Sequence, residues 1–302
     1  MLVKHAGIRK TASDRVMDFF AYSIMAVVFL VTFYPFWNIL VISLNDASDT
    51  LRGGLYFFPR KLALDSYQVM LREAVFLRSF GVSLARTVLG TPVGLLCTSF
   101  AAYALIHERM PGRRFLSMFF IFTMYFSGGL IPYYMILKWV GLTDKFLVYI
   151  VPNALDLFHL VIMMAFMRSL PGEMEEAAMV EGAGFGTIFF RIILPVCGPI
   201  LATIGLFIAI GHWNSWFDSY AFTYSENLKT LQAYLVQILN QYKGGDMSRV
   251  SSMISDSMKR TQVNSESIRM AATIIAAIPI VMMYPFVQKY FVKGILVGAI
   301  KA

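Results

Sequence analysis

Two ionisable side chains stand inside an otherwise apolar stretch of this chain. Asp156 and His159 lie within Val148–Met167, three residues apart, so a helix would place them one turn apart on one face. A carboxylate beside an imidazole could pass a proton along a relay, and an ionisable residue in a membrane segment is a functional candidate. A relay needs further carboxylates along its path, and the sequence shows none. We therefore interpret the pair as structural or as facing a cavity.

A second group places aromatic rings beside an amide. Trp213, Asn214 and Trp216 stand together at the end of another apolar segment. Sugars present apolar C–H faces and many hydroxyl groups, so these three residues are the candidates for a substrate path. The alternative is an interfacial aromatic belt that holds the helix end at the headgroup level. Arg86 is expected to snorkel from the edge of its segment, and His212 to pack.

The composition indicates an integral membrane protein. The chain has 302 residues, of which 58% are hydrophobic and 15% charged, with a mean hydropathy of +0.64. A soluble domain usually carries about 25% charged residues. The net charge of +8 is explained by basic residues at the cytoplasmic ends of spans. Because no basic run is interleaved with exposed aromatics, we expect no nucleic-acid partner, and membrane lipid surrounds the chain instead.

Six segments have the length and polarity of membrane spans, which take about 20 mostly apolar residues each. In lipid the backbone must satisfy its own hydrogen bonds, so we expect six transmembrane helices and an all-α integral membrane fold. The alternating polarity of a barrel is absent. The segments are roughly Phe19–Leu44, Val82–Ile106, Phe115–Leu137, Val148–Met167, Val196–Phe217 and Met270–Tyr290.

An even number of spans puts both termini on one side. Basic residues in the short tails and in the connection after the second span favour the cytoplasm for that side. We therefore expect a cytoplasmic tail over residues 1–18, one transmembrane domain over 19–290 and a second cytoplasmic tail over 291–302. The long loops 45–79 and 219–269 would then face outward. The basic residues are Lys4, Arg9, Lys10, Arg15, Arg109, Arg113, Arg114, Lys289, Lys293 and Lys301.

A patterned loop over residues 171–195 separates the fourth and fifth spans. Glu176-Ala177-Ala178 is followed after three residues by Gly182 and after nine more by Ile192-Ile193-Leu194-Pro195. Glutamates in the first turn favour a helix start, and Gly182 can take a positive φ, so the chain can reverse there. Phe185–Leu194 predicts a second helix, and Pro195 is expected to start the fifth span. Such a helix pair can transmit force, although an ordinary connector is the alternative.

The spacing of this loop resembles the conserved loop of permease subunits in ATP-binding-cassette (ABC) importers. Two residues depart from that pattern, Glu181 and Gly184, and the second is expected to weaken the cap of the following helix. The short turn Met110–Arg114, the segment Trp213–Asp218 and the tail from Tyr290 are similar to carbohydrate permeases of the maltose-permease-like branch. Within it, the importers of complex or acidic oligosaccharides are the nearest in pattern. The matched loop positions are Glu176, Ala177, Ala178, Gly182, Ile192, Leu194 and Pro195.

The resemblance implies a type I ABC importer permease fold with a cytoplasmic coupling helix. It implies a bacterial plasma-membrane protein, half of a path for an oligosaccharide, working with a related second permease. An ABC ATPase dimer and an extracellular or periplasmic solute-binding protein would complete the importer. The chain lacks the GxxxxGK[ST], HExxH and GxSxG patterns, so we expect no catalysis and no cofactor in this subunit, with ATP and Mg at the partner ATPase. The alternatives are a permease for a non-sugar solute and an ion-coupled secondary transporter, which should show repeats.

The second outer loop has two predicted parts. Thr230–Asn240 is expected to form a helix that packs on the spans, whereas Tyr242–Ser267 is long and polar. The resemblance implies that this loop reaches the binding protein. The alternative is an insert without a role.

Overall fold

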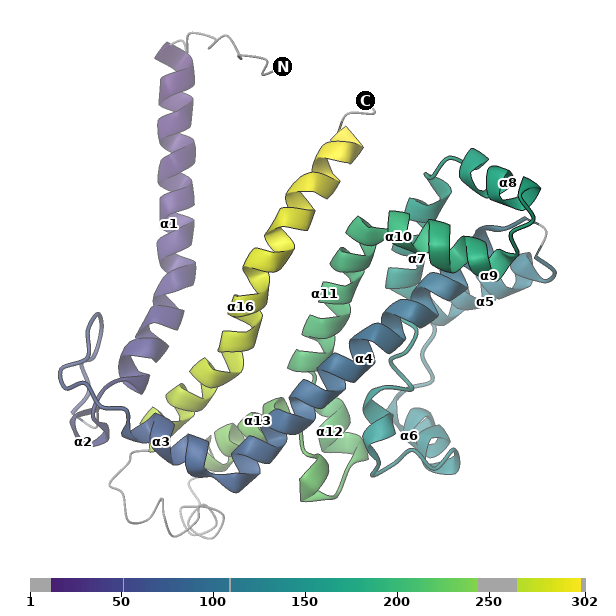
Figure 1. The fold of residues 1–302 in the computed structure, drawn as a ribbon. Coiled ribbons are helices and arrows are strands. Elements are labelled where there is room, and N and C mark those ends of the chain that lie inside the picture. The colour runs from purple at the N-terminus through teal and green to yellow at the C-terminus, as the bar shows by residue number, and fades with distance from the viewer. Residues whose placement is uncertain (1–11, 51, 109, 244–264, 300–302) are drawn as a thin grey trace. The chain divides into compact units, whose positions relative to one another are not determined.

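The computed structural model describes residues 12–50, 52–108, 110–243 and 265–299. Regular structure within these ranges is helical, apart from one isolated antiparallel bridge between Asn45 and Leu62. The chain divides into two units, residues 1–70 with 254–274 and residues 71–253 with 275–302. Figure 1 gives the order of the helices.

The first unit begins with α1 (Ala12–Ser43), an apolar helix of 32 residues. The short α2 (Ala47–Thr50) follows, and α3 (Asp65–Arg72) starts in this unit. Asn45 fixes the loop between them. Its Nδ2 donates to Oδ2 of Asp49 over 3.1 Å, and its Oδ1 accepts from the backbone N–H of Lys61 over 3.0 Å. A few buried polar side chains thus shape the predicted outer loop 45–79.

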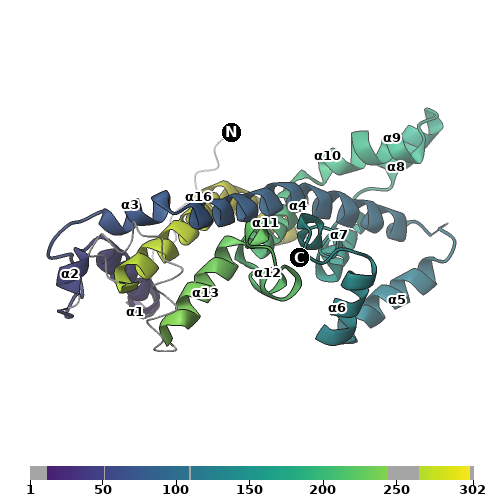
Figure 2. The same ribbon diagram turned by 90° about the horizontal axis from the view of Figure 1, so that it is seen from below.

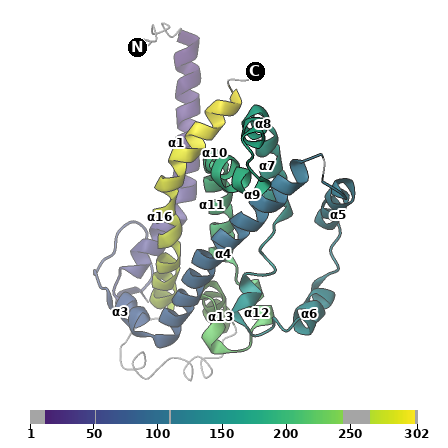
Figure 3. The ribbon, with the colours of Figure 1, turned by 45° about the vertical axis from the view of Figure 1, so that its right-hand side comes forward.

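The core of the second unit is formed by α4 (Ala74–Ile106), α7 (Leu157–Arg168) and α11 (Gly198–Asn214), which lie side by side (Figure 1 and Figure 3). Small residues allow these helices to approach closely. A Cβ on Gly94 would lie 3.2 Å from Cδ1 of Ile208, and one on Gly205 would lie 3.1 Å from Cδ1 of Leu95. Glycine is therefore the residue that sets the spacing between α4 and α11.

Three described helices are long and apolar enough to cross a membrane: Ser13–Ser43, Ala74–Ile106 and Glu266–Met283, the last within α16 (Ser265–Ala299). A fourth span is possible if Phe185–Val196 and Gly198–Asn214, which meet at a bend of 82°, count as one. By length and composition, the described part of the chain is thus an all-helical membrane protein with three or four candidate spans.

The third expected span, Phe115–Leu137, is not one continuous helix, and this expectation is wrong. The helix α5 (Arg113–Tyr125) ends before an extended Phe126, and α6 (Leu130–Trp139) begins after Gly129. The sequence Ser127-Gly128-Gly129 explains the break, because Gly129 has a φ of +82°, which a right-handed helix cannot contain.

The fourth expected span, Val148–Met167, is also interrupted. A 3₁₀ turn, η1 (Phe146–Tyr149), precedes a non-helical stretch, and α7 starts only at Leu157. Pro152 lacks the N–H that a helix interior requires. Asp156 then caps α7, its side chain accepting from the N–H of His159 over 2.9 Å. The run of apolar residues predicted a membrane segment here, but Pro152 and the capping residue Asp156 decide where the helix begins.

The two ends of the second unit carry different elements. At one end lie α8 (Glu173–Val180) and α9 (Phe185–Ile188), and at the other lies α12 (Phe217–Phe222) (Figure 1 and Figure 3). The turn η3 (Glu226–Leu228) follows α12 in the chain, and Figure 2 gives the view from below. The predicted helix over 230–240 is confirmed as α13 (Leu231–Lys243), with Leu231 buried. Most of the predicted polar segment 242–267 lies outside the described residues, as do residues 1–11 and 300–302 of the predicted tails.

Candidate functional site

The patterned loop forms a short helix with a defined end. Three glutamates stand in the first turn of α8, where the helix dipole favours negative charge. At its end the N–H of Gly182 donates to the carbonyl of Met179 over 3.0 Å, and the N–H of Ala183 donates to the carbonyl of Ala178 over 2.9 Å. This pair of bonds is a Schellman motif. Gly182 has a φ of +83°, as its place in the sequence predicts.

The helix α8 is anchored on one side and exposed on the other. Ala178 is buried and joins the core cluster formed by α4, α7 and α11. Val180 and Phe185, by contrast, are 89% and 61% exposed. Glu176 and Ala177 also lie on the exposed surface. The loop therefore presents an apolar tip beside a carboxylate, which suits docking into the groove of another protein.

The segment after the turn differs from the expectation for Pro195. Helix α9 runs directly into a π-helical turn, η2 (Phe189–Ile193), and then into α10 (Leu194–Val196). The break comes at Cys197, so α11 begins at Gly198, and Pro195 precedes the bend of 82°. Pro195 therefore does not start the fifth span. Gly184 caps α9 without a side-chain hydrogen bond, as its residue type predicts.

A histidine tethers α8 to the end of α4. Nε2 of His107 lies 2.9 Å from Oε2 of Glu175, and Nδ1 lies 2.7 Å from the carbonyl oxygen of Tyr103. Both ring nitrogens thus lie within hydrogen-bond distance of an oxygen atom. A cavity of about 950 Å³, lined mainly by apolar side chains, lies beside this tether. The tether fixes the position of α8 relative to the longest helix of the second unit's core.

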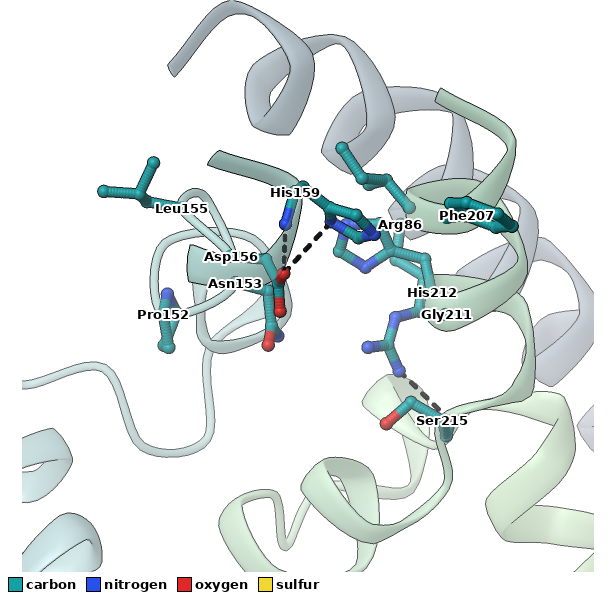
Figure 4. Close-up of a pocket in the computed structure, with 11 residues that line it drawn as sticks. Arg86, Pro152, Asn153, Leu155, Asp156, His159, Phe207, Gly211, His212 and Ser215 are labelled. Atoms are coloured by element: carbon teal, nitrogen blue, oxygen red, sulfur yellow. Dashed lines mark hydrogen bonds and ion pairs between the residues drawn. The ribbon is translucent and has the colours of Figure 1, made fainter. Parts of the chain in front are cut away.

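A second candidate site is a polar cavity of about 320 Å³ between α4, α7 and α11. Asp156 and His159 line it, so of the two interpretations of this pair, structural or facing a cavity, the structure shows the second (Figure 4). Nδ1 of His159 lies 3.3 Å from Oδ1 of Asp156. Arg86 and His212 contribute from α4 and α11, so three helices supply the charged and polar lining.

Arg86 does not snorkel, and that expectation is wrong. Its side chain is 1% exposed, and its guanidinium binds the carboxylate of Asp218 and, over 3.3 Å, the carbonyl oxygen of Ser215. The guanidinium carbon also lies 4.5 Å from the ring centroid of Tyr149. A charge that far inside an apolar helix needs a partner, and Asp218 supplies it from the first turn of α12.

The three predicted substrate residues are placed differently from one another. Trp213 is 4% exposed and its indole N–H donates to the carbonyl oxygen of Ala276 over 2.9 Å. Asn214 and Trp216 lie on the exposed surface. None of the three is among the residues that line the polar cavity. The aromatic–amide pattern located this end of α11 but not the cavity beside it.

Sequence reasoning missed three contacts, each of which left a signal. Arg86 stands inside the apolar helix α4, which predicts an acidic partner for its charge, and that partner is Asp218. His107 follows the last turn of α4 and could reach the acidic start of α8. Gly90 faces His212, and a Cβ there would lie 2.7 Å from Cε1 of the imidazole. A glycine inside an apolar span is the usual sign of such a close approach.

Known proteins share the sequence pattern and the architecture of this chain. No family model matches the chain. Protein LplC of Bacillus subtilis is 35% identical over 294 residues, covering 97% of this chain and 98% of that protein. The polygalacturonan/rhamnogalacturonan transport system permease protein YtcP of the same organism is 32% identical over 290 residues, covering 95% and 99%. A chain in a crystal structure of a bacterial ABC transporter involved in import of the acidic polysaccharide alginate is 26% identical, with a TM-score of 0.84, over 94% of this chain and 100% of that chain.

Proposed function

We infer the role of this chain from its family: it belongs to the permeases of binding-protein-dependent carbohydrate ABC importers. It is the non-catalytic membrane subunit of an importer for a sugar or oligosaccharide.

We propose that the chain crosses the membrane six times, with both termini in the cytoplasm. Helices α5 and α6 together, and η1 with α7, then count as interrupted spans. Two contacts agree with this topology. His107 and Glu175 join loops that would both lie inside, and Asp144 and Ser225 join loops that would both lie outside. Six spans enclose only half of a sugar-sized path, so a second, related permease closes the other half.

The observation that carries the coupling role is the geometry of α8. Val180 and Phe185 are exposed at and just after its C-terminal end, and Gly182 fixes the turn that ends it. The contact between His107 and Glu175 holds its first turn. A short helix held at both ends moves as a rigid body and passes force to α4. We propose that an ABC ATPase dimer, which supplies ATP and Mg, receives this helix. Of the seven motif positions, Glu176, Ala177, Gly182 and Pro195 are exposed and would contact the ATPase, whereas Ala178, Ile192 and Leu194 pack on the core and would support the loop from behind.

The proposed substrate is an oligosaccharide, with acidic ones included. The relative YtcP is named for polygalacturonan and rhamnogalacturonan, and the similar solved transporter for alginate. A solute-binding protein outside the cell would deliver the sugar. Trp216 and Asn214, which are exposed at the end of α11, remain candidates for the path, whereas Trp213 has its indole N–H bonded to Ala276.

The test is reconstitution of the complete importer in vesicles with Glu176→Lys. We expect loss of sugar-stimulated ATP hydrolysis and of uptake by at least about tenfold, equal to about 1.4 kcal/mol of docking free energy. Glu173→Lys is the matched control, because it carries the same cost at the helix dipole but lies outside the motif. Equal loss in both variants, or no loss in either, would contradict the coupling role. Uptake driven by an ion gradient without ATP would contradict the family's mode of transport.

A further inference from the structure

The loop between α2 and α3 carries three adjacent aromatic residues on its surface. Tyr56, Phe57 and Phe58 are 62%, 64% and 75% exposed. The proposed topology places this loop outside the cell, and neither the coupling role nor the polar cavity uses these rings. A contiguous group of exposed apolar side chains marks an interaction surface. The position of the rings relative to α1 identifies what that surface meets.

The base of this loop (residues 52–64) is fixed at the end of α1 by backbone hydrogen bonds. The N–H of Asp46 donates to the carbonyl of Lys61 over 2.8 Å. The N–H of Ala63 donates to the carbonyl of Leu44 over 2.9 Å. The two strands of chain that enter and leave the loop therefore lie together just beyond the last residue of α1.

From this base the loop turns back along α1 (Figure 1 and Figure 3). The indole N–H of Trp37 donates to the carbonyl of Phe57 over 2.8 Å. Nδ2 of Asn38 donates to the carbonyl of Leu55, also over 2.8 Å. The rings of Phe57 and Tyr34 have their centroids 5.9 Å apart. The aromatic tip of the loop is therefore held against the side of α1, short of the helix end.

The charge pattern of α1 fixes the depth of this contact. Asp18 is the last charged residue of the helix, and the residues from Phe19 to Ser43 are all uncharged. About 20 residues cross the hydrocarbon core, so a core that begins after Asp18 ends near Asn38. At a rise of 1.5 Å per residue, Trp37 lies about 9 Å inside the end of α1. The tip therefore lies at the boundary between hydrocarbon and headgroups, where aromatic rings concentrate.

We propose that the loop over residues 52–64 is a membrane anchor whose aromatic tip enters the outer leaflet of the bilayer. The rings of Tyr56 and Phe58 contact lipid, and Phe57 joins the tip to α1. The proposal rests on the topology above, in which the C-terminal end of α1 faces outward. The anchor goes beyond the transport role, because it sets the depth at which α1 sits in the membrane.

Polarity along the loop follows the change from headgroups to hydrocarbon. Lys61 stands at the base and is exposed, at the level of the headgroups. Arg60 is held near the base, because its Nε donates to Oδ2 of Asp49 over 2.8 Å and its Nη2 to the carbonyl of Gly53 over 2.7 Å. The charged side chains are thus kept at the base, and the aromatic rings stand at the tip.

A lipid surface fits this geometry better than a soluble protein does. The base of the loop lies farther out than its tip, so a binding protein that arrives from outside meets the base first. The tip also has its backbone carbonyls bonded internally, as lipid requires. Those of Leu55 and Phe57 accept from α1 as described, and that of Tyr56 lies 3.5 Å from Nδ2 of Asn38.

The experiment uses the complete importer in right-side-out vesicles, with the exposed Cys97 replaced by Ser. A bimane fluorophore is attached to Phe58→Cys, to Tyr56→Cys at the same tip, and to the control Lys61→Cys at the base. Lipids brominated on their acyl chains quench a label that reaches the hydrocarbon, and external iodide quenches a label that water reaches. We expect brominated lipid to remove most of the fluorescence at both tip positions and iodide to remove little. The order should be reversed at Lys61→Cys.

The outcomes separate the anchor from the topology and from a protein contact. Quenching of the tip labels by external iodide and not by brominated lipid would overturn the anchor. Tip labels that neither quencher reaches would show that a protein covers the tip, which also overturns the lipid contact. That protein is the solute-binding protein if the shielding depends on its addition, and the second permease otherwise. If iodide quenches Lys61→Cys only from inside the vesicles, the proposed topology itself is contradicted.

Discussion

Arg86 and Asp218 form a two-point ion pair between α4 and α12. Nη2 lies 2.5 Å from Oδ2 and Nη1 lies 3.1 Å from Oδ1, and the side chains are 1% and 13% exposed. The N–H of Ser219 also donates to Oδ1 of Asp218 over 2.8 Å. The pair neutralises a charge inside an apolar helix and fixes the turn that follows α11.

Asp218→Ala should destabilise the chain strongly, because it leaves the Arg86 guanidinium buried without its counter-charge. Breaking a buried pair from one side costs about 3–5 kcal/mol. The double variant Arg86→Met with Asp218→Leu should recover most of that loss, since it removes both charges together. The melting temperature of the purified importer in detergent measures both effects. If Asp218→Ala melts at the same temperature as the wild type, the pair does not stabilise the folded chain.

Gly90→Ala should also destabilise, for a steric reason. Its Cβ would lie 2.7 Å from Cε1 of His212, and overpacking of this kind costs about 1–3 kcal/mol. Adding His212→Ala should relieve the clash. Gly81→Ala on the same helix is the control, because its Cβ meets nothing within 4 Å and alanine favours a helix. Equal melting temperatures for Gly90→Ala and Gly81→Ala would contradict the close approach.

These two predictions concern contacts that the sequence did not reveal, although it revealed the elements that carry them. Apolar length located α1, α4 and α16, because a span must satisfy its backbone in lipid and so needs a long apolar helix. It could not show where a span is interrupted. Gly129 and Asp156 decide that locally, through a positive φ and a side-chain cap. A hydropathy average over a whole segment is insensitive to single residues of this kind.

The loop at α8 was the part best predicted, because its signals are local. Acidic residues in the first turn and a glycine at the C′ position specify a short helix from neighbouring residues alone. The cavity was predicted only in part. Asp156 and His159 share one helix end and could be paired from spacing, whereas Arg86 and His212 come from helices far apart in the chain. Their meeting depends on how α4 and α11 pack, which spacing along the chain does not encode.

Gly182→Ala should weaken coupling more than it weakens folding. An L-residue at a φ of +83° costs about 1–2 kcal/mol, and the strain falls on the turn that ends α8. Gly182→Asn should be milder, because Asn tolerates this region. Gly186→Ala is the control, since the φ of that glycine is not positive and a Cβ built there would meet no atom within 4 Å. Sugar-stimulated ATP hydrolysis should fall for Gly182→Ala and stay near wild type for Gly186→Ala. The reverse order would contradict a role for this turn.

Asp144 joins the turn after α6 to the turn after α12 through its carboxylate. Oδ2 accepts from the hydroxyl of Ser225 over 2.6 Å, and Oδ1 accepts from the N–H groups of Tyr224 and Ser225, each over 2.8 Å. The hydroxyl bond from Ser225, followed by the two backbone bonds, lowers the pKa of Asp144 below its usual 3.8. All three donors favour the ionised form. A carboxylate with a lowered pKa in the folded chain makes stability depend on pH.

The lowered pKa of Asp144 decides how the stability of the chain changes with pH. The stabilisation is fully present above the unfolded pKa of 3.8, and it is lost as the pH falls through the lower pKa of the folded chain. Asp144→Asn keeps a residue that tolerates the positive φ of 54° but removes the charge. The melting temperature of this variant should lie below wild type at pH 6, and the difference should shrink as the pH is lowered toward 3. Glu226→Gln removes the same charge from the neighbouring turn without touching these donors and should show no such convergence. A gap between Asp144→Asn and wild type that stays constant from pH 6 to pH 3 would mean that the carboxylate's charge does not hold the two turns together.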